Sequence, residues 1–122
     1  MTTGFWKSNW EETKQHFVDW WNQDGLLAYI WDLPEADSPH EAVAHPGETP
    51  DIEYFYTQPE WRARWNHYIL SREQYPADTF PVAGTMIGPG SLALFLGSEA
   101  RLSVDTVWFE PCIDPDDPVG HP

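Results

Sequence analysis

Residues 26–31, LLAYIW, form an uninterrupted apolar run that starts directly after Gly25 and stops at the acidic sequence DLPEAD. A strand with one wet face alternates polar and apolar residues, whereas a strand of a parallel sheet is covered on both faces and reads as a continuous apolar run. The run therefore predicts a buried strand in an α/β fold, with helices on both faces of the sheet.

Two longer segments, residues 8–24 and 57–74, have the pattern of helices. Each begins with a capping box, a pair of side chains that can satisfy free amides of the first helical turn: Ser8 with Glu11, and Thr57 with Glu60. Aromatic residues recur near helical spacing in both segments. We expect the helices to pack on the sheet through these residues: Trp20, Trp21, Trp61 and Trp65.

The remaining segments complete an alternating order of helices and strands. We expect strands at 79–83 and 106–109, a short helix at 91–96, and a parallel pairing between 26–31 and 79–83. Residues 32–56 form a long acidic, proline-rich loop, and residues 112–122 are expected to be an unpacked tail. The whole of 1–122 is expected to be a single domain, and the resemblance described below implies that this domain is incomplete.

The charge of the chain argues against several classes of partner. The net charge is −14, with only six Lys and Arg residues, so we expect no binding to nucleic acid or to an anionic membrane surface. No apolar run approaches the length of a membrane span, and no secretory signal is visible, so a cytoplasmic location is the default. Cys112 is the single cysteine. His40 and His45 in the long loop match no standard ligand spacing, and we predict no metal-binding residue.

The glycine-rich stretch IGPGSLALFLG, residues 87–97, allows a specific test of nucleotide binding. Gly88, Gly90 and Ala93 fit the spacing of a dinucleotide fingerprint. The apolar block after Gly90 is too short for a crossover helix, and no Lys-Ser/Thr follows the glycines. Dinucleotide binding is therefore the third of three hypotheses, and a structural corner is favoured, in which glycine permits positive φ and close backbone approach.

Four short motifs occur in a distinctive order after the sequence WRARW. They are Tyr75–Asp78, Gly88–Leu92, Leu96-Gly97 and Asp105–Phe109. In this order they resemble proteins of the uroporphyrinogen decarboxylase-like superfamily. The resemblance implies a (β/α)8 TIM barrel, which needs about 250 residues, so these 122 residues would be its N-terminal portion, with a mainly parallel sheet flanked by helices.

The same resemblance implies a set of site residues. Asp78 matches the central catalytic aspartate of the family. Substrate-binding positions would be Trp31 and Asp32 after the first strand, with Gly88 and Gly90 shaping the mouth of the site. True uroporphyrinogen decarboxylases, which are lyases, have arginines after the first strand, but this chain has YIWDLPEAD there.

The missing arginines favour a methyltransferase-type or unassigned member of the superfamily, acting on a small-molecule substrate. Zinc and a corrinoid protein partner would be possible only in the full-length protein, and the fragment itself is expected to be inactive.

The alternative hypothesis is a small acidic, Trp-rich interaction domain without catalysis. Eight tryptophans are many for so short a chain, and aromatic residues are common at interfaces. In the hypothesis of a partial barrel, the aromatic side chains that would face the missing strands and helices outnumber the elements that can cover them. We therefore expect several of five residues to be unusually exposed: Tyr29, Trp31, Phe80, Trp108 and Phe109.

Overall fold

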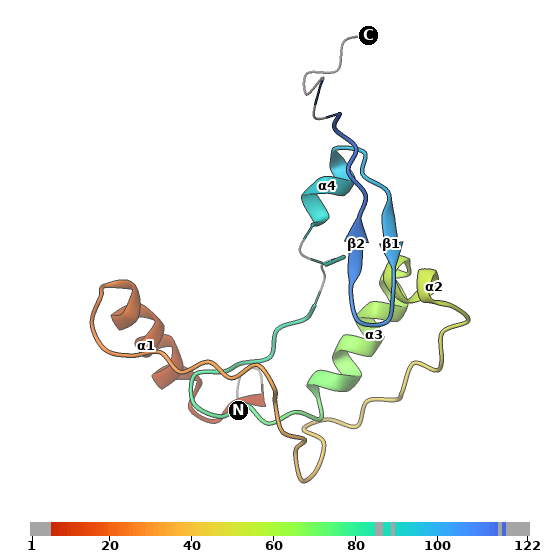
Figure 1. Ribbon diagram of the computed structural model, residues 1–122. Helices are drawn as coiled ribbons and strands as arrows, with labels where there is room; N and C mark the ends of the chain where they lie inside the picture. The colour runs from red at the N-terminus through yellow and green to blue at the C-terminus, as the bar shows by residue number, and fades with distance from the viewer. Residues whose placement is uncertain (1–5, 85–86, 89, 115, 117–122) are drawn as a thin grey trace. The chain divides into compact units, whose positions relative to one another are not determined.

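The computed structural model describes residues 6–84, 87–88, 90–114 and 116 (Figure 1). Within this part the helices are α1 (Trp10–Trp21), α2 (Ile52–Thr57), α3 (Pro59–Leu70) and α4 (Ser91–Phe95), and the strands are β1 (Ala100–Leu102) and β2 (Val107–Phe109). The two strands form an antiparallel hairpin. The prediction of a mainly parallel sheet from a TIM barrel is therefore wrong.

The chain divides into two compact units. The first unit comprises residues 1–46 and 63–83, and the second comprises residues 47–62 and 84–122. The helix α3 contributes its first turn to the second unit and the rest of its length to the first.

Residues 26–31 and 79–83, which were predicted to be paired strands, are extended but are not strands. The amide of Ala28 donates to Asp78 Oδ2 at 3.0 Å, and the amide of Ile30 donates to Thr79 Oγ1 at 2.8 Å. The segments therefore lie side by side at Asp78 and Thr79, but side-chain oxygens occupy the amides that a strand ladder would use. Pro81 also has no amide hydrogen to donate to a ladder.

The helix α1 is shorter than the predicted 8–24 and starts differently. Its N-cap is Asn9, which makes no side-chain capping bond to the backbone and instead donates to Glu12 Oε2 at 3.1 Å. The predicted capping box is therefore wrong, because Ser8 precedes the cap position. Trp21 is 80% exposed, so the prediction that α1 packs through this side chain is also wrong.

The predicted helix 57–74 is two helices. Thr57 is the last residue of α2, and its hydroxyl donates to the carbonyl of Glu53 at 2.8 Å rather than capping a new helix. Pro59 begins α3, a position where its fixed φ is suitable and its missing amide hydrogen costs nothing. Asp51 caps α2 by accepting the amide of Tyr54 at 2.7 Å.

The interior of the first unit is small and rich in polar groups. Its buried side chains are Lys7, Thr13, Ser71, Tyr75, Asp78 and Thr79. An aromatic cluster accompanies them, in which the ring of Phe80 makes T-shaped contacts with the rings of Trp10, Phe17 and Tyr29. Hydrogen bonds between segments distant in sequence therefore hold this unit together, along with apolar contacts.

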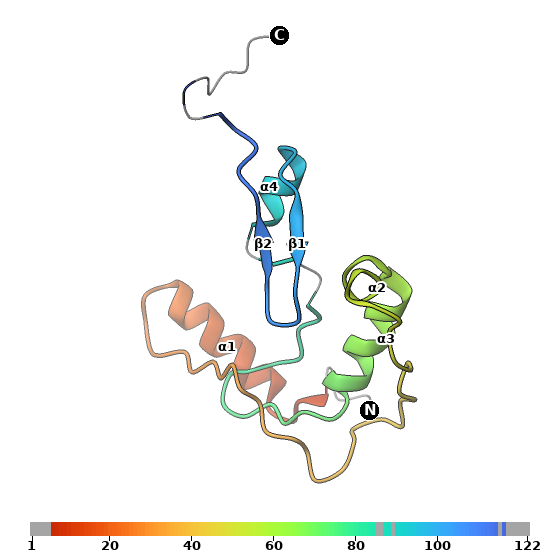
Figure 2. The same cartoon turned by 45° about the vertical axis from the view of Figure 1, so that its right-hand side comes forward.

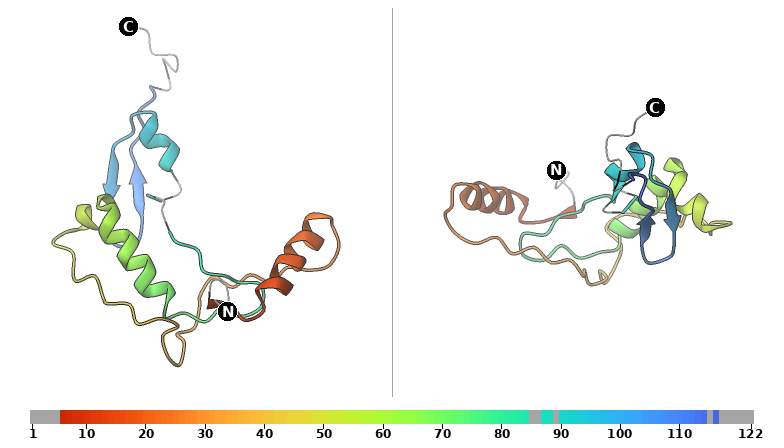
Figure 3. Two further views of the ribbon diagram at one scale, coloured as in Figure 1. Left: turned by 180° about the vertical axis from the view of Figure 1, so that it is seen from behind. Right: turned by 45° about the horizontal axis from the view of Figure 1, so that its top comes forward.

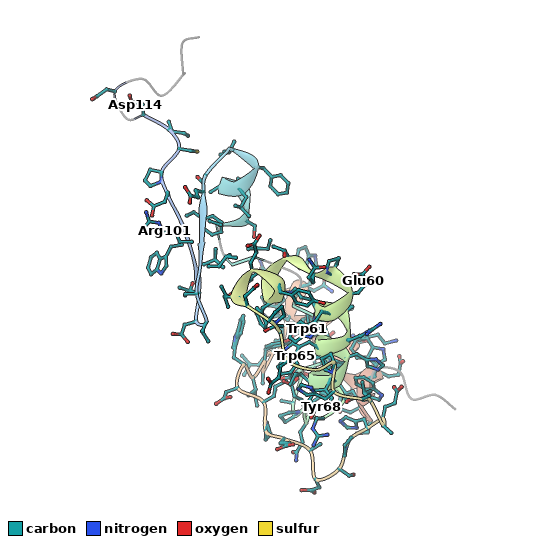
Figure 4. All side chains as sticks on the ribbon, turned by 90° about the vertical axis from the view of Figure 1, so that its right-hand side faces the viewer. Glu60, Trp61, Trp65, Tyr68, Arg101 and Asp114 are labelled. Carbon is teal, nitrogen blue, oxygen red and sulfur yellow. The ribbon has the colours of Figure 1, made fainter. Side chains whose placement is uncertain are left out.

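Aromatic side chains of α3 pack on the long loop rather than on a sheet. Trp65 and Tyr68 project from α3 (Figure 4) and receive the ring of His45 edge-on, with ring centroids 5.5 and 4.8 Å apart. In the second unit Trp61 packs against Phe55 of α2. The predicted packing of Trp61 and Trp65 on a sheet is therefore wrong.

The second unit is built around the hairpin. The helix α4 lies beside it (Figure 2), and α2 contacts β1 (Figure 3). The hydroxyl of Tyr56 donates to the carbonyl of Ser103 at the turn of the hairpin, at 3.0 Å. The guanidinium of Arg62 lies over the rings of Phe55 and Tyr56.

Exposure agrees with the expectation for three of the five aromatic residues. Trp31 is 91% exposed, and Trp108 and Tyr29 are also exposed, whereas Phe80 and Phe109 are half-buried. Of the predicted tail, 115 and 117–122 lie outside the described residues. Among the residues that the structure describes, no helix is long and apolar enough to cross a membrane.

Candidate functional site around Asp78

Asp78 lies at a tight turn in the first unit, directly after Ala77, which has a positive φ of 51°. Its side chain is 7% exposed. Oδ1 lies 2.6 Å from His16 Nδ1, and Oδ2 accepts the amide of Ala28 at 3.0 Å. The amide of Asp78 in turn donates to the carbonyl of Ala28 at 3.0 Å. This residue therefore joins α1, the extended segment 26–31 and the turn after Tyr75.

His16 supplies the partly exposed member of this pair. It lies on α1, 62 residues before Asp78, and its side chain is 41% exposed. An ionised carboxylate only accepts hydrogen bonds, so Nδ1 carries the hydrogen and donates it to Asp78. The hydrogen bond from Nδ1 to Asp78 raises the pKa of His16, and the nearby charges of Asp78, Glu12 and Asp19 add to the effect.

The pKa of Asp78 is shifted in the opposite direction. Burial disfavours the charged carboxylate, but the hydrogen bonds from the Ala28 amide and from His16 outweigh burial, with help from the charges of His16 and Lys7. The pKa of Asp78 is therefore held below its ordinary value. The two shifts together favour an ion pair of imidazolium and carboxylate.

Lys7 is buried beside the same turn. Its Nζ donates to the carbonyls of Tyr75 and Ala77 at 3.0 and 2.6 Å. Burial lowers the pKa of Lys7, while the charges of Asp78 and Glu12 favour the protonated form. Because its hydrogens are directed at backbone carbonyls, Lys7 fixes the turn that presents Asp78.

A stack of four rings closes the first unit near this turn. Trp6 lies between His40 and His67, with centroids 5.9 and 5.7 Å away and nearly parallel planes, and His40 also stacks on Tyr75. The Tyr75 hydroxyl donates to the carbonyl of Leu70, and burial raises the pKa of Tyr75 well above its usual range. The stack holds the segment that contains Lys7 against α3.

The predicted substrate-binding residues fall into both units. Trp31 and Asp32 are exposed in the first unit, just beyond the contact of Ile30 with Thr79. Gly88 and Gly90 belong to the second unit, where they pack against Val107 and Phe109. The roles in substrate binding stay predictions.

The predicted structural reason for the two glycines is confirmed. Gly88 has a φ of +72°, and a Cβ atom on Gly90 would lie 2.3 Å from Cδ2 of Phe109. These are the positive φ and the close approach that glycine permits.

Within the described residues, no group of three or more His, Cys, Asp or Glu side chains is placed to hold a metal ion. His40 stacks instead on the ring of Trp6, and His45 makes a T-shaped contact with the ring of Trp65. The zinc of corrinoid-linked methyltransferases therefore has no fitting ligand set in this part of the chain. Cys112 is exposed, and it accepts a hydrogen bond from the Ser98 hydroxyl at 3.3 Å.

Sequence reasoning identified Asp78 but missed both of its charged neighbours. His16 and Lys7 match no motif and are 62 and 71 positions away from Asp78. A helical periodicity places His16 near Thr13 on one face of α1, and Thr13 is fully buried. The sequence shows the helical spacing, but the burial of Thr13, which shows that His16 borders the interior, is known only from the structure.

Scans of protein-family models, curated proteins and solved structures found no match to this chain.

Proposed function

We propose that this chain supplies the Asp78 site to an enzyme of the uroporphyrinogen decarboxylase-like type, and that the reaction is methyl transfer rather than porphyrinogen decarboxylation. The proposal concerns the site and the reaction, and does not include a barrel. The observation that carries it is the buried Asp78 carboxylate hydrogen-bonded to a partly exposed imidazole. Oppositely shifted pKa values in such a pair are typical of acid–base sites.

The packing of the motif residues supports the proposal. Tyr75 and Asp78, from the first motif, are buried. Gly90, from the second motif, lies against Phe109, from the last. Other motif positions are exposed, among them Leu92, Leu96 and Trp108, so the support comes only from the packed motif residues.

The charge near residues 31–37 supports methyl transfer over porphyrinogen decarboxylation. A porphyrinogen substrate carries several carboxylates, and its binding needs cations. Asp32, Glu35 and Asp37 are exposed here, and Glu35 pairs with the guanidinium of Arg72 at 3.4 Å. Carboxylates that face solvent repel a polycarboxylate, which disfavours uroporphyrinogen.

The proposal includes a small-molecule substrate, a corrinoid protein as partner and a cytoplasmic location. An exposed free thiol such as that of Cys112 persists in a reducing compartment, which supports the location. A corrinoid group would supply a metal-bound methyl carrier. The described residues would contribute the proton chemistry of the Asp78 site.

The test is to express the complete reading frame and to compare two assays, decarboxylation of uroporphyrinogen and methyl transfer between methylcobalamin and a thiol acceptor. We expect methyl transfer, a loss of at least about 100-fold in Asp78→Asn, and little change in Asp37→Asn, which removes an exposed loop charge. Robust decarboxylation of uroporphyrinogen would refute the proposal.

A second candidate, an interaction domain without catalysis, is favoured by the exposed tryptophans. Trp21 and Trp31 are both at least 80% exposed, and large exposed aromatic surface is typical of interfaces. Urea unfolding of the 122-residue chain tests it. A single cooperative transition, with a slope suited to the full length, would favour this candidate, and a broad transition of low slope would count against it.

A further inference from the structure

The Asp78 carboxylate has little capacity left for a substrate. Oδ1 is engaged by His16, Oδ2 is engaged by the Ala28 amide, and the side chain is almost wholly removed from solvent. His16 is arranged in the opposite way. Its Nδ1 is committed to Asp78, while Nε2 has no hydrogen-bond partner among the residues that the structure describes, and the ring is partly exposed.

We propose that His16 is the catalytic acid that meets the substrate and that Asp78 is its positioning residue. This inference rests on the proposed function, in which Asp78 belongs to the reacting site. Asp78 fixes the hydrogen on Nδ1, which directs the exchangeable proton to Nε2, and it stabilises the charged ring. The arrangement is a pair of base and orienting carboxylate, of the kind used in many acid–base sites.

The charged groups around the pair decide between a role as acid and a role as base. Asp78 faces Nδ1 from the turn, and Glu12 and Asp19 lie on the same helix as His16. Lys7 is the cation near Asp78, but its hydrogens are directed to the carbonyls of Tyr75 and Ala77. The surroundings of His16 are therefore net negative, which favours the protonated ring and hence proton donation at neutral pH.

The step itself is a single proton transfer. The Nε2–H bond of His16 breaks, a bond forms between that proton and the substrate atom that gains negative charge, and the ring becomes neutral. Water then returns a proton to Nε2. When a methylated substrate passes its methyl group to the corrinoid, the substrate atom that loses the methyl gains negative charge and accepts this proton. The same acids disfavour anionic ligands, so the substrate class is an uncharged or cationic small molecule.

The first experiment measures the pairing in the 122-residue chain without any substrate. The chain is labelled on its histidine rings and titrated by NMR, with His16→Gln used to assign the His16 signals. We expect the His16 pKa to lie above its ordinary value and to fall by about one unit in Asp78→Asn. The matched control is Asp19→Asn, which removes a half-buried acid of α1 that acts on His16 by its charge only and should produce a smaller fall.

A second measurement needs no substitution at Asp78, so it holds even where Asp78→Asn disturbs the fold. Carbethoxylation by diethyl pyrocarbonate, which is attacked by the unprotonated nitrogen of a neutral imidazole, is followed on His16 of the unaltered chain as a function of pH. We expect His16 to react with an apparent pKa equal to that of its NMR titration, as a solvent-facing Nε2 requires. A His16 that titrates at or below its ordinary value, or that does not react in the folded chain, overturns the inference whatever the function of the protein.

The last experiment separates the inference from the function on which it rests. In the complete reading frame, His16→Gln should lower methyl transfer from a thioether to cob(I)alamin, the reverse of the thiol assay, at least about 100-fold, with loss of the rate decrease at high pH that deprotonation of His16 causes. Unchanged rate and pH profile in an active His16→Gln enzyme overturn the role of His16 alone. If the pKa of His16 is raised but the protein catalyses neither methyl transfer nor decarboxylation, the proposed function is overturned, and the catalytic role of His16 with it.

Discussion

Replacing Gly90 by alanine tests how the second unit is packed. A Cβ atom at this position would lie 2.3, 2.6 and 3.0 Å from Cδ2, Cε2 and Cγ of Phe109. Contacts this short require either the Phe109 ring or the start of α4 to move. Overpacking of this kind costs about 1–3 kcal/mol. Gly90 is also the N-cap of α4, where alanine is a poorer residue than glycine.

The assay should report on the hairpin itself. The amide of Glu110 donates to the carbonyl of Glu99 at 3.0 Å, next to the paired strands, so its hydrogen-exchange rate follows opening of this region. A loss of about 1–3 kcal/mol corresponds to exchange that is roughly 5- to 150-fold faster. Gly84→Ala is the matched control, because nothing lies within 4 Å of a Cβ there and the φ is not positive.

A double-mutant cycle identifies the source of the loss. If the Phe109 ring causes it, Gly90→Ala should cost much less in a Phe109→Ala background, with a coupling of about 1 kcal/mol or more. The packing described for Gly90 would be refuted if Gly90→Ala lowered stability equally with Phe109 present and with Phe109→Ala, or if it did not lower stability when Phe109 is present.

Three other predictions concern the first unit and α2. Trp6→Ala removes two stacked ring contacts and should lower the free energy of unfolding, measured in urea, by about 1–3 kcal/mol. Trp21→Ala, at an exposed position, should change it by less than about 0.5 kcal/mol. Equal effects of the two substitutions would contradict the stack. Asp51→Ala should reduce helicity measured by circular dichroism and cost about 0.5–2 kcal/mol, and Asp51→Asn should restore most of it, because either side chain can cap α2. Because the pKa of His16 is raised, this residue stabilises the fold below its unfolded pKa of 6.5, and that stability is lost as pH rises through the folded pKa. Because the pKa of Asp78 is lowered, this residue stabilises the fold above its unfolded pKa of 3.8, and that stability is lost as pH falls through the folded pKa. Unfolding at a series of pH values should therefore show these two slopes flanking the window from 3.8 to 6.5, and Asp78→Asn should flatten both.

The sequence predicted local features well and long-range pairing poorly. A helix within 8–24, a short helix after Gly90 and a strand at 107–109 are all present, because each follows from the residues of one segment. The strand predicted at 26–31 is absent because Asp78 and Thr79 provide side-chain acceptors for its amides, and an apolar run contains no information on which acceptor it meets.

The candidate site was predicted only in part for the same reason. Asp78 could be singled out from a motif, and the conformational roles of Gly88 and Gly90 from the chemistry of glycine. His16 is joined to Asp78 by a tertiary contact over 62 residues, and no spacing in the sequence specifies such a contact.

The burial of Lys7 turns it into a reporter of opening in the first unit. The chain has two lysines, and Lys14 stands half-exposed on α1 with its amine near Glu11. An amine-reactive reagent should modify Lys14 in every molecule, but it should reach Lys7 only when the turn at Tyr75–Ala77 releases it. The ratio of the two modification rates, measured by mass spectrometry of peptides, then reports how often the turn that holds the Asp78 site opens.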